Sequence, residues 1–148
     1  MKAYLDSSVV LRIVLRAPNA LAEWGMIAEH TSSALLRVEC LRTLERLRFE
    51  EEIPEEEIAR RVKEVLLVME SVRLLSITSS VLARASEPFD GPLKSLDAIH
   101  LATAIEWRRQ GNVDLVFATH DRQLSRAARA AGFTVFGAPP KPAETSAQ

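Results

Sequence analysis

The residues in this sequence that could carry chemistry are acids placed where predicted strands end or predicted helices begin. They are Asp6, Glu39, Asp97 and Asp121. If these carboxylates converge, two of them about 4 Å apart repel by roughly 4 kcal/mol at an effective dielectric constant near 20. Hard divalent cations relieve such repulsion because they prefer oxygen ligands, and Mg²⁺ needs only one or two direct carboxylates. A pair of these ions suits in-line hydrolysis of a phosphodiester.

Each acid also has a purely structural interpretation, which spacing alone leaves open. Asp6 and Asp121 are natural helix N-caps. Asp97 would complement a helix dipole, and Glu39 would pair with Arg42 on an exposed helix face. The helix that carries Asp97 argues against simple exposure, because a carboxylate on a mostly buried helix must find a partner or stay neutral. The neighbours of Asp97 on that helix are apolar: Leu96, Ala98, Ile99, Leu101, Ala102, Ala104 and Ile105.

Predicted strands and helices alternate along the chain. Strands are expected at 2–5, 30–33, 72–77, 114–119 and 133–136. Helices are expected at 9–15, 19–30, 80–86, 96–109 and 121–131, with two longer ones between about 34 and 69. This order predicts an α/β fold with a central parallel sheet of about four to five short strands, flanked by helices on both faces. Ligands of such sheets bind beyond the carboxyl ends of the strands, at the topological switch point, where Asp6 would project.

Length and composition are those of an ordinary globular domain. The 148 residues, 47% of them hydrophobic and 26% charged, predict one domain over 1–137, followed by a disordered tail over 138–148 that contains three prolines. The formal net charge of −1 gives no global basic field. A single cysteine, Cys40, excludes an internal disulfide and suits a reducing cytoplasm. No uncharged apolar stretch approaches the length of a membrane span.

Four segments carry a resemblance to a known family. They are "YLDSSVVLRI", "SSALLRVECLRTLERL", "LDAIHLATAIE" and "LVFATHDRQLSRAARAAG", in this order and spacing. Through them the chain, from residue 2 to about 136, resembles PIN-domain proteins, and more narrowly the VapC-type toxin ribonucleases of bacterial and archaeal toxin–antitoxin pairs. The resemblance implies a PIN-like three-layer fold and metal-dependent endonucleolytic cleavage of RNA by metal-activated water.

The resemblance also implies which residues form the site. Its acidic quartet consists of Asp6, Glu39, Asp97 and Asp121. Asp6 and Asp97 are expected as the principal ligands of Mg²⁺ or Mn²⁺, and the other two acids are expected to act directly or through water. A hydroxyl is expected near the metal, from Ser8 or alternatively Ser7, and Thr119 is expected to line the site.

Binding partners follow from the same resemblance and from charge spacing. Members of this family usually form homodimers and are silenced by an antitoxin, so both partners are expected here. Arg122, Arg126 and Arg129 follow a helical i, i+4, i+7 spacing beside Asp121, which fits either contacts with RNA phosphates or a solvated helix face. We expect His100 to be a hydrogen-bonded core residue and assign no role to His120.

Three other kinds of protein also place an aspartate after a first strand. A PIN-like module that binds RNA or protein without cutting would keep the fold, although the intact quartet speaks against it. A haloacid-dehalogenase-like phosphatase would carry a second acid at position 8, which is serine here. A receiver domain would phosphorylate an aspartate at the end of the third strand, and the segment "SITSS" has none.

Overall fold

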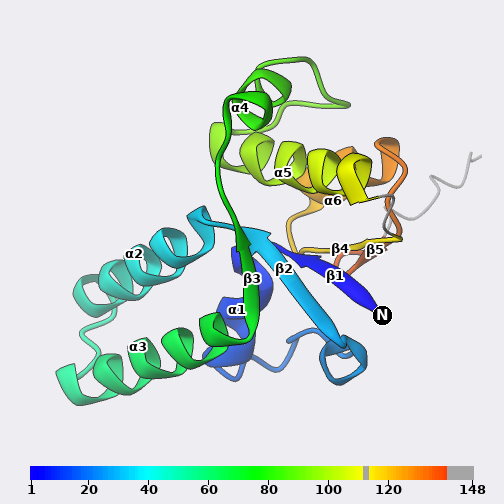
Figure 1. Ribbon diagram of the computed structural model, residues 1–148. Coiled ribbons are helices and arrows are strands. Elements are labelled where there is room, and N and C mark those ends of the chain that lie inside the picture. The colour runs from blue at the N-terminus through cyan, green and yellow to red at the C-terminus, as the bar shows by residue number, and fades with distance from the viewer. Residues whose placement is uncertain (112–113, 140–148) are drawn as a thin grey trace, which may run out of the picture.

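The computed structural model describes residues 1–111 and 114–139 and confirms the predicted parallel sheet. Its five strands are β1 (Lys2–Leu5), β2 (Glu29–Ser33), β3 (Val72–Leu75), β4 (Val116–Ala118) and β5 (Val135–Phe136). They are ordered β3-β2-β1-β4-β5, and every neighbouring pair is parallel (Figure 1). The predicted tail begins at the buried Ala138, and its residues 140–148 lie outside the described part of the chain.

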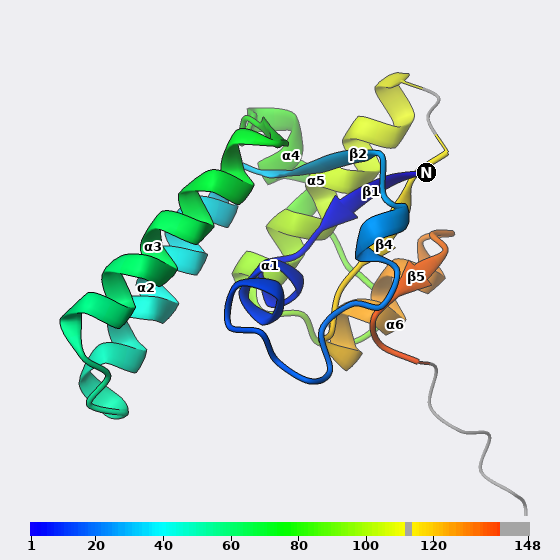
Figure 2. The same cartoon turned by 90° about the horizontal axis from the view of Figure 1, so that it is seen from below.

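Helices cover both faces of this sheet. They are α1 (Ser7–Val14), the 3₁₀ turn η1 (Trp24–Met26), α2 (Leu35–Glu50), α3 (Glu55–Glu70), α4 (Ser79–Ala85), α5 (Ser95–Gly111) and α6 (Arg122–Ala130). Helix α1 packs on one face together with the α2–α3 hairpin, which projects away from the sheet, whereas α5 and α6 pack on the other (Figures 1 and 2). The result is a three-layer α/β arrangement. Among the described residues, none of the helices has the length and apolar character required to cross a membrane.

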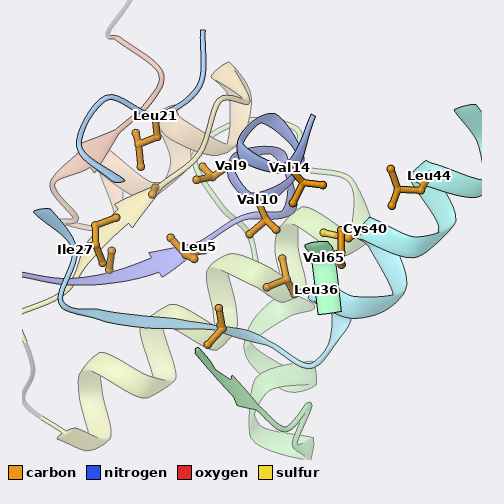
Figure 3. Packing of buried hydrophobic residues seen from close by; sticks show 13 residues of the cluster. Leu5, Val9, Val10, Val14, Leu21, Ile27, Leu36, Cys40, Leu44 and Val65 are labelled. Atoms are coloured by element: carbon orange, nitrogen blue, oxygen red, sulfur yellow. The ribbon is translucent and has the colours of Figure 1, made fainter. Parts of the chain in front are cut away.

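Strand β1 separates two hydrophobic clusters because successive side chains of a strand point to opposite faces. Ala3 and Leu5 belong to the cluster formed with α1, α2 and α3 (Figure 3). Tyr4 points the other way, into the cluster of α5 and α6, where its ring stacks on Phe117 of β4. All four side chains are fully buried. The central strand therefore fixes the position of both helical layers relative to the residue that follows it.

The carboxyl end of β1 is a topological switch point. From β1 the chain proceeds outward through β2 and β3, and it then returns to place β4 on the opposite side of β1. The backbone N–H of Asp6 donates to the carbonyl of Ala118 at 3.0 Å, which holds the ends of β1 and β4 together. Because ligand sites of open parallel sheets form at this position, side chains leaving β1 and β4 are placed where a site is expected.

One predicted element is wrong. The segment 19–30 was expected to be helical, but it forms a loop with the short turn η1, and β2 already begins at Glu29. His30 pairs with Ala3 in the sheet, and Leu21 and Ile27 are buried against the first cluster. Pairing with β1 and burial of the two apolar side chains thus override the helical propensity of this alanine-containing stretch.

The segment after β5 presses on the loop after β4. Gly137 has a φ of +99°, and a Cβ atom at this position would lie 2.5 Å from the carbonyl oxygen of Thr119. The Gly137 carbonyl also accepts a hydrogen bond from Nδ1 of His120 at 3.0 Å. Only glycine combines this backbone conformation with so close an approach, so Gly137 supports the loop that leads into α6.

We expect Gly137→Ala to lower the free energy of unfolding by about 2–3 kcal/mol, because it adds both left-handed strain and a clash with backbone. Urea denaturation followed by circular dichroism measures this change. Gly25→Ala is the matched control: Gly25 has open space around its Cα, and a change within about 0.5 kcal/mol is expected there. Equal stabilities of the two variants would contradict the account.

Candidate active site

Asp6 directly follows β1 at the topological switch point, and its side chain is 4% exposed. The region at this strand end is called the crevice below. It occupies the N-cap position of α1, but its carboxylate does not cap that helix. Its Oδ2 instead accepts hydrogen bonds from Ser8 Oγ at 2.6 Å and Thr119 Oγ1 at 3.0 Å. Within the described residues Oδ1 has no hydrogen bond. One oxygen of Asp6 is therefore fixed by two hydroxyls and the other is available.

Glu39 reaches the same crevice from α2. Its Oε1 makes a short hydrogen bond with Nε2 of the fully buried His100 on α5, and its Oε2 accepts a longer one, 3.4 Å, from Ser7 Oγ. The alternative pairing with Arg42 is not found among the described residues. Glu39 is therefore directed inward across the sheet edge. Both predicted serines contact a predicted acid, Ser8 through Asp6 and Ser7 through Glu39.

The surroundings of Asp97 raise the pKa of its carboxyl group. Burial at the first turn of α5, followed by the charges of Asp6, Asp121 and Glu39, raises the pKa of this carboxyl to about 6, although nearby His100 opposes the shift. Carboxylates perturb one another in this way only at short range. The structure therefore brings Asp97 into the electrostatic neighbourhood of the other three acids.

Asp121 is the exposed member of the quartet and caps α6. Its Oδ1 accepts from the backbone N–H of Leu124 at 2.7 Å, and its own N–H donates to Thr119 Oγ1 at 3.0 Å. The backbone N–H of His120 donates to Ser8 Oγ at 3.0 Å. The structural interpretation of Asp121 as an N-cap is thus correct, and it coexists with a place beside Asp97. The loop 119–121 is tied to α1 through the same hydroxyls that hold Asp6.

His100 was expected to be a satisfied core residue, and it is buried with both ring nitrogens hydrogen-bonded. It also contacts a site acid, because Nε2 pairs with Glu39, while Nδ1 pairs with the Tyr4 hydroxyl at 2.8 Å. Burial alone would lower its pKa, but the hydrogen bond to Glu39 and the charges of Asp6, Glu39 and Asp97 raise it. Its spacing of three from Asp97 placed both on one helix stripe, whereas the partner on α2 was not visible in the sequence.

The ligand atoms of the crevice are close enough to surround a cation. One potential ligand atom from each of Asp6, Glu39 and His100 lies within 4.8 Å of the others. The nearby carboxylates raise the pKa of His100 against the effect of its burial, and they add to burial in raising the pKa of Asp97. Carboxylate oxygens are the ligands that Mg²⁺ and Mn²⁺ prefer. The carboxylates of Asp6 and Glu39 therefore fit a hard divalent cation, whereas both ring nitrogens of His100 are already hydrogen-bonded.

The three arginines proposed to contact RNA differ in their surroundings. Arg126 forms an ion pair with Asp90 at 3.2 Å. Arg129 donates to Ser125 Oγ and the Ala138 carbonyl and is partly buried. Arg122 is exposed and makes no ion pair within the described part of the chain. Of the three, Arg122 is the exposed guanidinium group without an ion pair in the described part of the chain, and it directly follows Asp121.

Comparison with known proteins agrees with this geometry. A family model described as the PIN domain matches residues 3–130. Ribonuclease VapC46 of Mycobacterium tuberculosis (strain ATCC 25618 / H37Rv) is 35% identical over 137 residues, which cover 89% of this chain and 94% of the relative. Ribonuclease VapC47 of Mycobacterium tuberculosis (strain CDC 1551 / Oshkosh) is 28% identical over 137 residues, covering 88% and 92%.

The family model spans most of the described chain, including all four acids, and the similarity to the first relative extends over nearly its whole length. The chain therefore belongs to the PIN-domain family, in which it is of the VapC type.

Proposed function

We propose that this protein is a metal-dependent endoribonuclease, the toxin of a toxin–antitoxin pair, and that it hydrolyses RNA phosphodiesters at the crevice of Asp6, Glu39, Asp97 and Asp121. The observation that carries the proposal is that ligand atoms of Asp6 and Glu39, from two separate segments, lie within 4.8 Å of each other beside the end of β1. The charges of Asp6, Asp121 and Glu39, which add to burial in raising the pKa of Asp97, support the inclusion of the other two acids. Ribonuclease activity is in the names of both relatives.

The cofactor of this reaction is proposed to be Mg²⁺ or Mn²⁺. Asp6 and Asp97 would be its principal ligands, and Glu39 and Asp121 would bind it directly or through water. Such a cation supplies activation of the attacking water and stabilisation of the leaving oxygen. The donor set supports this assignment, because mutually repelling carboxylates at the end of a buried strand need a positive partner.

The chain's own residues would orient the reacting groups. Ser8 and Thr119 donate to one oxygen of Asp6 and thereby direct the other. Capping of α6 restrains Asp121 in the same manner. Fixed carboxylate orientations lower the entropy that binding would otherwise cost.

Partners are proposed by the same reasoning. An antitoxin would silence the enzyme, and the α2–α3 hairpin is a candidate docking surface because Val38, Phe49 and Leu67 are large apolar side chains exposed on it. A homodimer is expected as the working form. We propose that it acts in the cytoplasm, where RNA and antitoxin are available.

Replacing Asp97 by Asn tests the proposed activity directly. Because a metal ligand contributes several kcal/mol to the transition state, we expect Mg²⁺-dependent cleavage of a structured RNA to fall by at least about 10³-fold, with RNA binding retained. Cleavage is measured on antitoxin-free protein by gel electrophoresis, with Asp114→Asn, an exposed aspartate outside the crevice, as the control. Binding of RNA without products by the wild type would instead favour a module that does not cut.

The same substitution is expected to stabilise the metal-free protein. The pKa of Asp97 is about 6 in the folded protein and about 4 in the unfolded chain, so the folded protein binds this proton more tightly. Proton binding by Asp97 therefore stabilises the folded state at low pH, and this stabilisation is lost as the pH rises from about 4 through 6. Metal-free Asp97→Asn should therefore melt above the wild type at pH 7.5, and the difference should shrink towards pH 4. Calorimetry across this range measures it. A constant difference at all pH values would contradict the electrostatic origin.

Removal of Arg122 is expected to lower the affinity for RNA and to make that affinity less dependent on salt concentration. If this guanidinium contacts a phosphate, Arg122→Ala should reduce the slope of log affinity against log salt by about 1. Fluorescence anisotropy with a labelled RNA at several salt concentrations measures the slope. Arg126→Ala is the matched control, because Arg126 is paired with Asp90. Identical slopes for wild type and Arg122→Ala would exclude the contact.

A further inference from the structure

A buried connection links Tyr4 and His100, which are not members of the acidic quartet, to Glu39, which is. It begins at the hydroxyl of Tyr4 in the middle of β1, passes through the imidazole of His100 on α5 and ends at Oε1 of Glu39 on α2. The tyrosine and histidine are 0% exposed. Buried polar groups in such a series are costly unless every member is paired, so the arrangement needs an explanation beyond packing.

The direction of the hydrogen bonds follows from the chemistry of each group. The Glu39 carboxylate can only accept, so Nε2 of His100 carries the proton that it shares with Oε1. Burial raises the pKa of Tyr4, which keeps its hydroxyl protonated. In the neutral ring the hydroxyl donates to Nδ1, which holds the imidazole in the tautomer with Nε2–H directed at Glu39.

A common pattern links Glu39 to two other site acids. In Asp6 the hydroxyls of Ser8 and Thr119 occupy Oδ2, and in Asp121 the backbone of Leu124 occupies Oδ1. Each of these carboxylates has one oxygen held by a strong donor. In Glu39 the corresponding donor is His100, and Oε2 has only a 3.4 Å contact with Ser7 Oγ.

We propose that His100 is the positioning residue that would make Glu39 a one-oxygen ligand: its Nε2–H holds Oε1, which would leave Oε2 to bind a divalent cation, and the Tyr4 hydroxyl holds the ring in place. This inference rests on the proposed function, because it assumes that the crevice binds a divalent cation. It assigns a cation-directing role to a side chain that is not an acid. Partners that orient metal-binding carboxylates typically contribute 10–100-fold to metal affinity.

Three substitutions separate this role from packing. His100→Met removes the donor and fills the space with a flexible apolar side chain. His100→Gln retains an N–H donor with similar reach. Tyr4→Phe keeps the imidazole but removes the group that fixes its tautomer. His30→Gln is the control histidine, since His30 packs on Trp24 in another part of the structure, with ring centroids 4.6 Å apart.

The measurement is calorimetric titration of the full chain, free of antitoxin, with Mn²⁺ or Mg²⁺ alone. We expect His100→Met to weaken binding by about 10–100-fold, Tyr4→Phe to weaken it by a smaller factor, and His100→Gln and His30→Gln to remain within about threefold of the wild type. Infrared difference spectra should show the cation-induced carboxylate bands shifting towards the two-oxygen mode in His100→Met and remaining unchanged in His100→Gln.

The outcomes distinguish this inference from the proposed function. Absence of cation binding by the wild type, or undiminished binding by Asp6→Asn, would overturn the metal site itself. Loss of binding in Asp6→Asn together with wild-type affinity in a folded His100→Met would overturn only the role of His100. If His100→Met does not fold, Tyr4→Phe decides: affinity equal to that of the wild type overturns the role, and weakened binding beside an intact His100→Gln supports it.

Discussion

Repulsion between carboxylates at the end of the central strand is the constraint around which this fold is organised. Asp6, Glu39 and Asp97 lie near one another in a crevice that is partly shielded from water, where like charges are least tolerated. The protein withstands this through hydroxyl donors, a helix cap and a buried imidazole, each of which satisfies one carboxylate oxygen. These donors reduce the repulsion but do not remove it, as the pKa of Asp97 shows. The repulsion that remains favours the binding of positive charge in the crevice.

The sheet and the main helices could be predicted because their signals are local. The apolar runs at 2–5 and 115–118 form strands, and Pro54 followed by three glutamates begins α3 as expected. The segment 19–30 was mispredicted because its conformation depends on pairing with β1, which no local pattern encodes. Strand ends were also overextended, since β4 begins at Val116 rather than 114.

The four acids of the site could be selected from the sequence, whereas their supporting contacts could not. Their positions near predicted strand ends and helix starts singled out the acids, and the resemblance to a family then implied the quartet. The strand order places the ends of β1 and β4, which precede Asp6 and Asp121, at the switch point. The partnership of His100 with Glu39 spans 61 positions of sequence and the edge of the sheet. Spacing along one helix could show that His100 shares a stripe with Asp97, but only the three-dimensional packing of α5 against β2 shows which acid it contacts. The same holds for Arg126, whose pairing with Asp90 depends on a distant loop.

The division of the acids between two hydrophobic layers has a consequence for biosynthesis. Glu39 belongs to α2 in the layer of α1, α2 and α3, whereas Asp97 lies on α5 and Asp121 caps α6 in the opposite layer, and Asp6 directly follows the central strand between them. A nascent chain therefore has no complete crevice until α6 has emerged from the ribosome and docked on the far side of β1.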